Sequence, residues 1–336
     1  MIKHIIILIL IILVFCFSGF AERVAVLPEL MKPRIMAVDD TQLYVTEEAS
    51  VFIYSLKDFK LVKKFGSAGQ GPQEFFIVPT VPLTIDVQTD QIIAVSIRKV
   101  SYFTKEGEFI KEVKMKSMAY FLQPMGDRFL GLSEIVEEGV VYQTINIYDL
   151  EINKLKEIYR VKKNFQKPGS GTRVLEKTFT YQAYEDKILL PGEDDATIDV
   201  FDNEMKKLFS IHLDQGKRKV DQKFKDTVIE RLKTDPTTKD IFPILKPIIF
   251  PDYFPTIAAF FVDDGTIYVM TWKIENSINE FFTYDMNGKF KKHLMIPIQY
   301  ETELQPYPIT INKEKLYQIV ENEEEEVWEF HMSEIK

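Results

Sequence analysis

Acidic side chains at the turns of this chain are the residues whose type and spacing could do chemistry. They stand where short expected strands turn back on themselves, as Glu47, Glu48, Glu137, Glu138, Glu193, Asp194 and Asp195. The six turns of this kind carry twelve acids and three bases. Carboxylate oxygens bind hard cations, and a ring of them attracts a basic partner. The alternative is that the tips of hairpins are charged because they are solvated.

Other groups able to carry catalysis are sparse. Beyond the first 21 residues the histidines are His212, His293 and His331, none of them in an HExxH pattern, and GxSxG is missing. His212 and His293 fall in outer strands and are expected on the rim. The glycine-rich segment 66–72 lacks the GKS or GKT of a phosphate-binding loop, so it is interpreted as a tight turn. No catalytic residue is predicted.

The elements that must position these side chains are short strands. Residues 33–75 contain four segments of strand length, rich in β-branched and aromatic residues and separated by polar breaks. A four-stranded meander of this kind cannot bury both faces alone, and weaker copies follow it. The second strands recur as Leu43–Val45, Ile92–Ala94, Phe129–Gly131, Ile188–Leu190, Ile267–Val269 and Leu316–Gln318. The pattern predicts an all-β, six-bladed β-propeller of four-stranded antiparallel blades.

The ends of the chain are expected to close the ring. The last unit reaches Lys336 with three strands, whereas Arg23–Leu27 is a strand-like piece that precedes the first unit. We therefore expect this N-terminal strand to complete blade 6, because pairing covers a sheet edge that would otherwise be bare.

One insertion, at about residues 220–255, separates blades 4 and 5. Val220–Leu232 has apolar residues four apart and predicts a helix, whereas prolines every four residues from Pro243 to Pro255 rule out a regular helix beyond it. We expect this arm to lie over the top face, defined as the face that carries the turns between second and third strands. Tyr253 and Phe254 on the arm and Trp272 beside it are predicted binding residues. Packing against the propeller is the alternative.

Residues 1–21 are predicted to be a secretory signal. Lys3 precedes an apolar run of 13 residues, Ile5–Phe17, shorter than the roughly 20 needed to span a bilayer. Cleavage after Ala21 would leave residues 22–336 without cysteine or membrane span, in the periplasm or outside the cell; an uncleaved anchor is the alternative. Lipidation of Cys16 is disfavoured by bulky Phe15 before it.

The first blade and its link resemble the bacterial six-bladed, NHL-like propeller family. The residues that carry the resemblance are Ala37–Asp39, Leu43–Val45, Phe52–Tyr54, Phe65, Gly66, Gly69–Pro72, Glu74, Phe75 and, in blade 5, Asp263–Val269. Gln73 stands where the family usually has glycine, so this turn is expected to differ locally. The resemblance implies the fold and export. Family members bind proteins, peptides or sugars, and related propellers include calcium-dependent hydrolases.

The sequence therefore predicts an exported binding or scaffold propeller that contacts a protein, peptide or glycan of the cell envelope. Its net charge of −9 argues against nucleic acid as a partner. No cofactor is predicted. One alternative is a calcium-dependent hydrolase or lactonase with the ion in the central channel, for which the expected inner strands offer Asp86, Asn312, Gln123 and Gln182. Another is a purely structural module of an envelope assembly.

Overall fold

The structure is a computed structural model that describes residues 21–78, 80–163, 171–175, 180–275 and 277–335. Residues 1–20 of the predicted signal, with Cys16, lie outside the described residues. Among the helices within these ranges, none is both long and apolar enough to cross a membrane.

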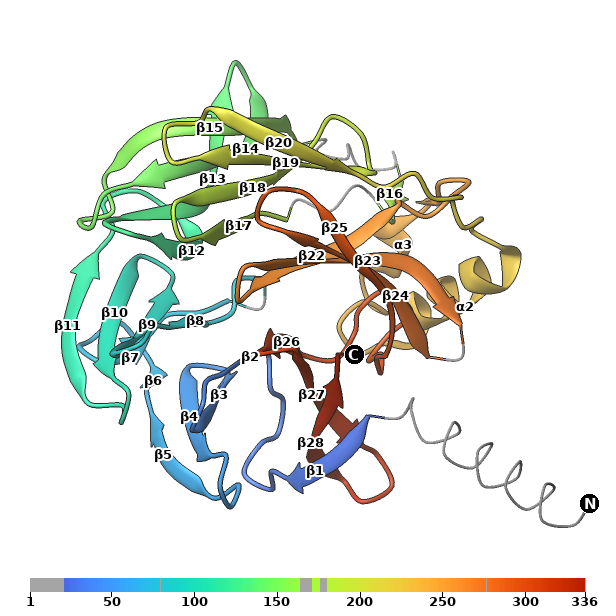
Figure 1. The fold of residues 1–336 in the computed structure, drawn as a ribbon. Helices are drawn as coiled ribbons and strands as arrows, with labels where there is room; N and C mark the ends of the chain where they lie inside the picture. Colours follow the sequence, from blue (N-terminus) through green and yellow to red (C-terminus); the bar gives the residue numbers. More distant parts are fainter. Residues whose placement is uncertain (1–20, 79, 164–170, 176–179, 276, 336) are drawn as a thin grey trace, which may run out of the picture.

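Six four-stranded antiparallel sheets stand around a common axis (Figure 1), which confirms the predicted six-bladed propeller. Their strands are, blade by blade, β2 (Ile35–Val38), β3 (Gln42–Glu47), β4 (Ser50–Ser55) and β5 (Leu61–Phe65); β8 (Thr84–Val87), β9 (Gln91–Ser96), β10 (Lys99–Thr104) and β11 (Phe109–Lys114); β12 (Tyr120–Met125), β13 (Arg128–Glu137), β14 (Val140–Tyr148) and β15 (Lys154–Lys162); β17 (Gln182–Tyr184), β18 (Lys187–Pro191), β19 (Thr197–Asp202) and β20 (Lys207–His212); β22 (Ile257–Asp263), β23 (Thr266–Glu275), β24 (Ile278–Asp285) and β25 (Phe290–Pro297); β26 (Ile309–Asn312), β27 (Lys315–Asn322), β28 (Val327–Glu334) and β1 (Glu22–Val26).

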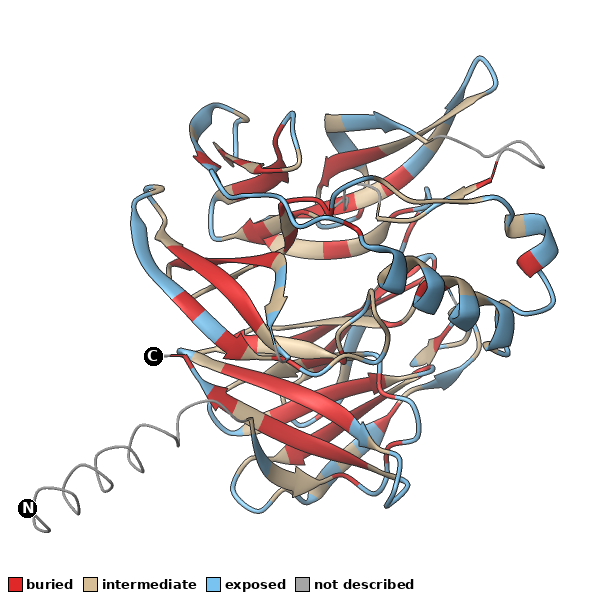
Figure 2. Cartoon of the chain, turned by 90° about the vertical axis from the view of Figure 1, so that its right-hand side faces the viewer, coloured by how far each residue is buried: buried red, intermediate tan, exposed pale blue. Residues whose placement is uncertain are grey.

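The core lies between neighbouring blades. The second strands are covered on both faces, so their side chains form continuous buried runs such as Leu43–Val45 in β3. Leu43 and Val45 pack toward blade 6, whereas Tyr44 packs toward blade 2, as the period of two along a strand requires. Figure 2 shows the same pattern as buried middle strands and exposed outer ones.

The N-terminal strand β1 pairs with β28 and completes blade 6, which confirms the predicted closure. Arg23 of β1 forms an ion pair of 2.8 Å with Glu329 of β28. Leu27, just after the strand, is fully buried in the cluster between blades 6 and 1. Closure is therefore supported by backbone pairing, by the ion pairs of Arg23 with Glu329 and Glu325, and by the buried Leu27.

The inner strand of blade 4 differs from the prediction. The sequence segment TFTYQ, residues 178–182, was predicted to be this strand; residues 178 and 179 lie outside the described residues, and the observed β17 begins at Gln182. Tyr181, just before it, is buried, and its hydroxyl donates a hydrogen bond of 2.8 Å to the Phe121 carbonyl oxygen of blade 3. The aromatic residue that suggested a strand therefore joins two blades instead.

The insertion between blades 4 and 5 contains the predicted helix, α2 (Gln222–Thr234). The Asp221 carboxylate caps it by accepting a hydrogen bond of 2.8 Å from the Phe224 amide. The following arm was predicted to be irregular, but it holds a one-turn helix, α3 (Phe242–Leu245), and a short strand, β21 (Ile248–Ile249). β21 pairs in parallel with β16 (Thr172–Arg173), a long-range contact that local patterns do not reveal.

Candidate functional site

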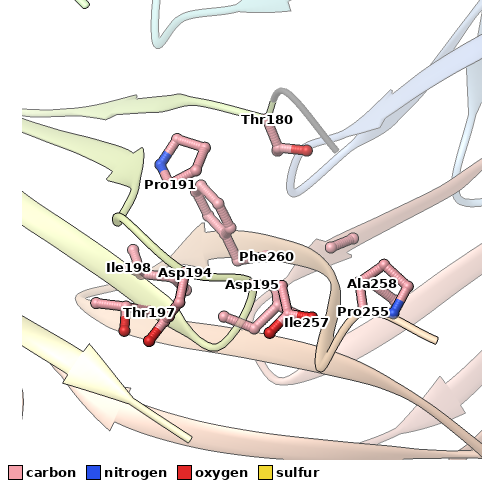
Figure 3. A pocket seen from close by; sticks show the side chains of 11 residues that line it. Thr180, Pro191, Asp194, Asp195, Thr197, Ile198, Pro255, Ile257, Ala258 and Phe260 are labelled. Atoms are coloured by element: carbon pink, nitrogen blue, oxygen red, sulfur yellow. The ribbon is translucent and has the colours of Figure 1, made fainter. Parts of the chain in front are cut away.

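The candidate site lies on the top face where blades 4 and 5 meet the arm. Two pockets adjoin there and share Pro255. The inner pocket of about 20 Å³ is lined by Thr180, Asp194, Asp195, Phe260 and their neighbours (Figure 3). The outer pocket, which we call the cleft, has a volume of about 240 Å³ and is lined by Gln215, Gly216, Lys217, Arg218, Pro255, Thr256, Thr271, Trp272, Lys273 and Glu280.

An aromatic cluster supports one wall of the cleft. Phe254 is 1% exposed, and its ring lies 4.8 Å from that of Phe224 on α2 and 5.4 Å from that of Trp272 on β23. The Arg218 guanidinium lies 4.6 Å over the Phe254 ring and donates a hydrogen bond of 3.0 Å to the Trp272 carbonyl oxygen. Cation–π contact and hydrogen bond together hold this cation at the cleft.

A buried carboxylate also lines the cleft. The Glu280 side chain is only 3% exposed and accepts hydrogen bonds from Thr271 Oγ1 (3.1 Å), Lys273 Nζ (3.1 Å) and His293 Nε2 (3.0 Å). Removing a carboxylate from water is costly unless such donors and charges compensate it. The hydrogen bond and the charge of Glu280 in turn raise the pKa of Lys273. The ring of His293 also stacks on Phe282 at 4.8 Å, which fixes its orientation.

A further ion pair, between the two pockets, ties the β18–β19 turn of blade 4 to the segment that precedes the insertion. Lys217 Nζ lies 2.9 Å from Asp195 Oδ2, and the Asp195 carbonyl oxygen accepts a hydrogen bond of 3.1 Å from the Ile257 amide of blade 5. Asp194 accepts a hydrogen bond of 3.0 Å from the Ala196 amide. Two of the predicted acidic residues therefore lie at the candidate site, where they orient the polypeptide.

The other predicted acidic residues stay apart, because they belong to different blades. The Glu47 carboxylate accepts hydrogen bonds from the Met31 and Lys32 amides, at 2.7 and 3.0 Å. Glu137 pairs with Arg160 on the outer strand of blade 3 at 2.5 Å. Glu48, Glu138 and Glu193 are exposed in turns.

Basic residues fold back over part of the top face. Lys163 pairs with Glu134 of blade 3, and Lys217 pairs with Asp195 of blade 4. The ring of negative charge expected from the turns is therefore interrupted at these two blades.

The predicted aromatic residues have different environments. Tyr253 is half-exposed on the arm, and Phe254 is buried beneath it. Trp272 is partly exposed in the cleft, and its indole N–H is buried with no hydrogen-bond partner among the described residues. Leaving such a donor unpaired costs about 1–3 kcal/mol, so a ligand oxygen or an ordered water that reached it would be favoured. Because Phe254 is buried, it can support the Trp272 ring but cannot itself contact a ligand.

Two of the residues that the calcium alternative would use, Asp86 and Gln123, have hydrogen-bond partners within the chain. Gln123 donates to the Tyr181 carbonyl oxygen at 3.2 Å and accepts from the Ala183 amide at 2.7 Å, so it joins blades 3 and 4. The Asp86 carboxylate accepts a hydrogen bond from the side-chain amide Nε2 of Gln88, and burial raises the pKa of Asp86. Within the described ranges, no three His, Cys, Asp or Glu side chains converge as metal ligands.

Sequence reasoning missed Arg218, Lys273 and Glu280 as residues of the site. A signal for two of them exists: Lys273 and Glu280 stand symmetrically about the tip of the β23–β24 hairpin, since Ile274 pairs with Asn279. Opposite charges at directly opposed positions stabilise each other. Arg218 has no comparable signal, because its partner Trp272 lies 54 positions away.

Comparisons with known proteins add little to this geometry. No family model matches the chain, and no curated protein matches it. Solved structures with a similar arrangement include a luciferin-regenerating enzyme (9% identity, 94% of this chain and 95% of that one, TM-score 0.46). Another is BamB from Moraxella catarrhalis, with 10% identity over 88% of this chain and 71% of that one and a TM-score of 0.31. A third is the Pan2 WD40 domain from Neurospora crassa, with 11% identity over 85% of this chain and 74% of that one and a TM-score of 0.40. The fold assignment rests on the strand order of the chain itself.

Proposed function

We propose that this chain is a binding propeller whose cleft between blades 4 and 5 takes an extended peptide segment of a partner protein. The observation that carries the proposal is the pairing, in one cleft, of a fixed cation, Arg218, with a buried carboxylate, Glu280, beside the partly exposed Trp272 ring. An extended peptide offers amide donors, carbonyl acceptors and apolar side chains in alternation, which these groups complement.

A glycan is the second candidate. The Trp272 ring lines the cleft together with hydrogen-bond donors and acceptors, a combination of groups that also suits a sugar. Phe254 covers part of that ring at 5.4 Å, which leaves less of it for a sugar to stack on and favours the peptide.

Tryptophan fluorescence tests the proposal directly. The chain has two tryptophans, and Trp328 is a buried structural one whose indole N–H donates to the Met31 carbonyl oxygen at 3.0 Å. Replacing Trp328 with Phe leaves Trp272 as the sole reporter in residues 22–336. We expect peptides captured from an envelope extract to shift its emission and Arg218→Ala to weaken binding about tenfold or more. Lys60→Ala, at an exposed position of blade 1, is the matched control.

Three results would separate the candidates. A shift with oligosaccharides but not with peptides would move the assignment to a glycan. Equal capture of partners by the Arg218→Ala variant and the unchanged chain would refute the cleft as the site. If every variant of the cleft still captured the same partners, the alternative of a structural module in an envelope assembly would be favoured.

We also propose that residues 1–21 direct export and are then removed, and that the chain is an NHL-like propeller of the cell envelope. The apolar run Ile5–Phe17 and the glycine-rich link of blade 1 support these two statements. Cleavage after Ala21 would keep β1, and with it the closed ring, intact. Mass spectrometry of the protein recovered outside the cytoplasm tests this: an intact Met1 would argue for a retained anchor.

Calcium binding is tested by thermal unfolding of residues 22–336 in EDTA and in millimolar calcium. A site occupied 100-fold above its Kd would raise the stability by about 2.7 kcal/mol, or several degrees in Tm. Such a rise would favour the channel hydrolase over the binding propeller and would justify a screen of lactones and esters.

A further inference from the structure

A third pocket on the top face, at blade 2, is separate from the inner pocket and the cleft. It has a volume of about 240 Å³ and lies where the link between blades 1 and 2 passes the β9–β10 hairpin. Its lining combines apolar with basic residues: Phe76, Ile97, Met115, Arg98, Lys99 and Lys114, with Gly69 and Gln70 of the link. None of the described residues that line it is acidic.

The basic residues of this blade 2 pocket are close together in the strand register. Lys99 and Lys114 are directly opposite each other in the β10–β11 ladder, and Arg98 precedes Lys99 in the tight turn. Like charges at directly opposed positions destabilise a sheet. Lys99 is 5% exposed, and its ammonium is compensated by the Glu112 carboxylate at 3.0 Å and the Gly71 carbonyl oxygen at 2.7 Å.

Two cations of the pocket remain uncompensated. Arg98 and Lys114 are exposed, and neither has an acidic partner in the described part of the chain. An Arg guanidinium can bind a carboxylate through two parallel hydrogen bonds, and a nearby ammonium adds a point charge. The site is therefore complementary to a single anionic group.

The apolar part of the lining limits which anion fits. Ile97 and Met115 are buried, whereas Phe76 is 41% exposed beside the cations. A small inorganic anion would leave this apolar surface in water, whereas a ligand with an apolar group next to its charge would cover it. The link on one side and the end of β11 on the other bound the pocket, which suits a chain end better than a continuous strand.

We propose that the blade 2 pocket binds the C-terminal carboxylate of a peptide or protein whose last residue is apolar. Arg98 and Lys114 hold the carboxylate, and Phe76, Ile97 and Met115 receive the last side chain. The carboxylate would supply the negative charge that Arg98 and Lys114 lack. This inference does not depend on the cleft between blades 4 and 5.

The wall of the pocket is built by the glycine-rich link. Glu74 Oε2 accepts a hydrogen bond of 2.8 Å from the Gly71 amide, and the Gly71 carbonyl oxygen faces Lys99. A Cβ added at Gly69 would lie 2.1 Å from Glu74 Oε2, so a side chain there would displace the Glu74 carboxylate from the link. The glycine-rich link, residues 66–72, thus shapes the blade 2 pocket through its backbone conformation.

The test uses fluorescently labelled hexapeptides that end in Phe or Leu, with either a free or an amidated C-terminus, and anisotropy with residues 22–336. We expect binding of the free acids, at least about tenfold weaker binding of the amides, and a similar loss in Arg98→Gln and Lys114→Gln. Both positions are exposed, so unchanged Tm values will show that the variants fold. Lys60→Gln, at an exposed lysine of blade 1, should bind as the unchanged chain does.

Several outcomes would overturn the proposal. They are equal binding of free and amidated peptides, no binding of either, and displacement of the peptide by inorganic phosphate at concentrations at which acetate has no effect. Arg218→Ala should leave this binding unchanged, so failure here and failure of the cleft between blades 4 and 5 are distinguishable.

Discussion

Replacing Arg23 with alanine should loosen the closure of the ring. Arg23 on β1 is 2.8 Å from the Glu329 carboxylate, whose side chain is 8% exposed, and Asn322 and His331 are the other partners of that carboxylate. Breaking a fully buried ion pair costs about 3–5 kcal/mol, but Arg23 itself is 44% exposed, which screens the pair. We expect a loss of about 1–2 kcal/mol, or roughly 2–6 °C in Tm at pH 7.

The pH dependence of this loss follows from Glu329. Burial acts to raise its pKa, but hydrogen bonds from Asn322 and His331 and the charge of Arg23 outweigh it, so the pKa is lowered. A carboxyl group whose pKa is lowered by folding stabilises the protein above its unfolded pKa, and this contribution is lost as the pH falls through the folded value. The difference between Arg23→Ala and the unchanged chain should therefore shrink in acid.

Thermal unfolding followed by circular dichroism between pH 3 and pH 7 measures both effects. Lys60→Ala removes an exposed ion pair with Asp58 and should change the stability by less than about 0.5 kcal/mol. An Arg23→Ala variant with an unchanged Tm at pH 7 would refute the role of the pair in closure. A difference that stays constant down to pH 3 would refute the role of Glu329 ionisation.

Three further changes probe the link, the arm and the channel. Gly66→Ala should lower the free energy of unfolding in urea by about 1–3 kcal/mol, because the added Cβ would lie 2.5 Å from the Phe75 ring at a backbone φ of +86°. Gly139→Ala is the control: its φ is +77° but the space around it is open, so the loss should be smaller. Phe254→Ala should cost about 3–5 kcal/mol and speed hydrogen exchange in α2; a loss below 1 kcal/mol would show that the arm does not depend on this ring. Asp86→Asn should raise the Tm at pH 7 but not at pH 3. Burial raises the pKa of the Asp86 carboxyl group, so its charged form lowers the stability of the protein as the pH rises. A lower Tm of the variant at pH 7 would contradict this.

Much of the fold was predictable because its signals are local. Runs such as Leu43–Val45 and Ile188–Leu190 indicated buried second strands, since only a strand covered on both faces is continuously apolar. The apolar spacing within Val220–Leu232 indicated α2 for the same reason: an amphipathic period is a signal within a few residues. The pairing of β16 with β21 was not predictable, because two-residue strands carry no periodicity.

By itself, the sequence determined the number of blades, the closure by the N-terminal strand and the place of the insertion. These depend on patterns repeated along the chain and on the need to pair a sheet edge. Only the tertiary structure decided which charges meet. Arg218 reaches Trp272, and Arg98 and Lys114 share a pocket, because blades and links bring distant segments within a few ångströms. Hydrogen bonds and ion pairs act over that distance in space, whatever the separation along the chain.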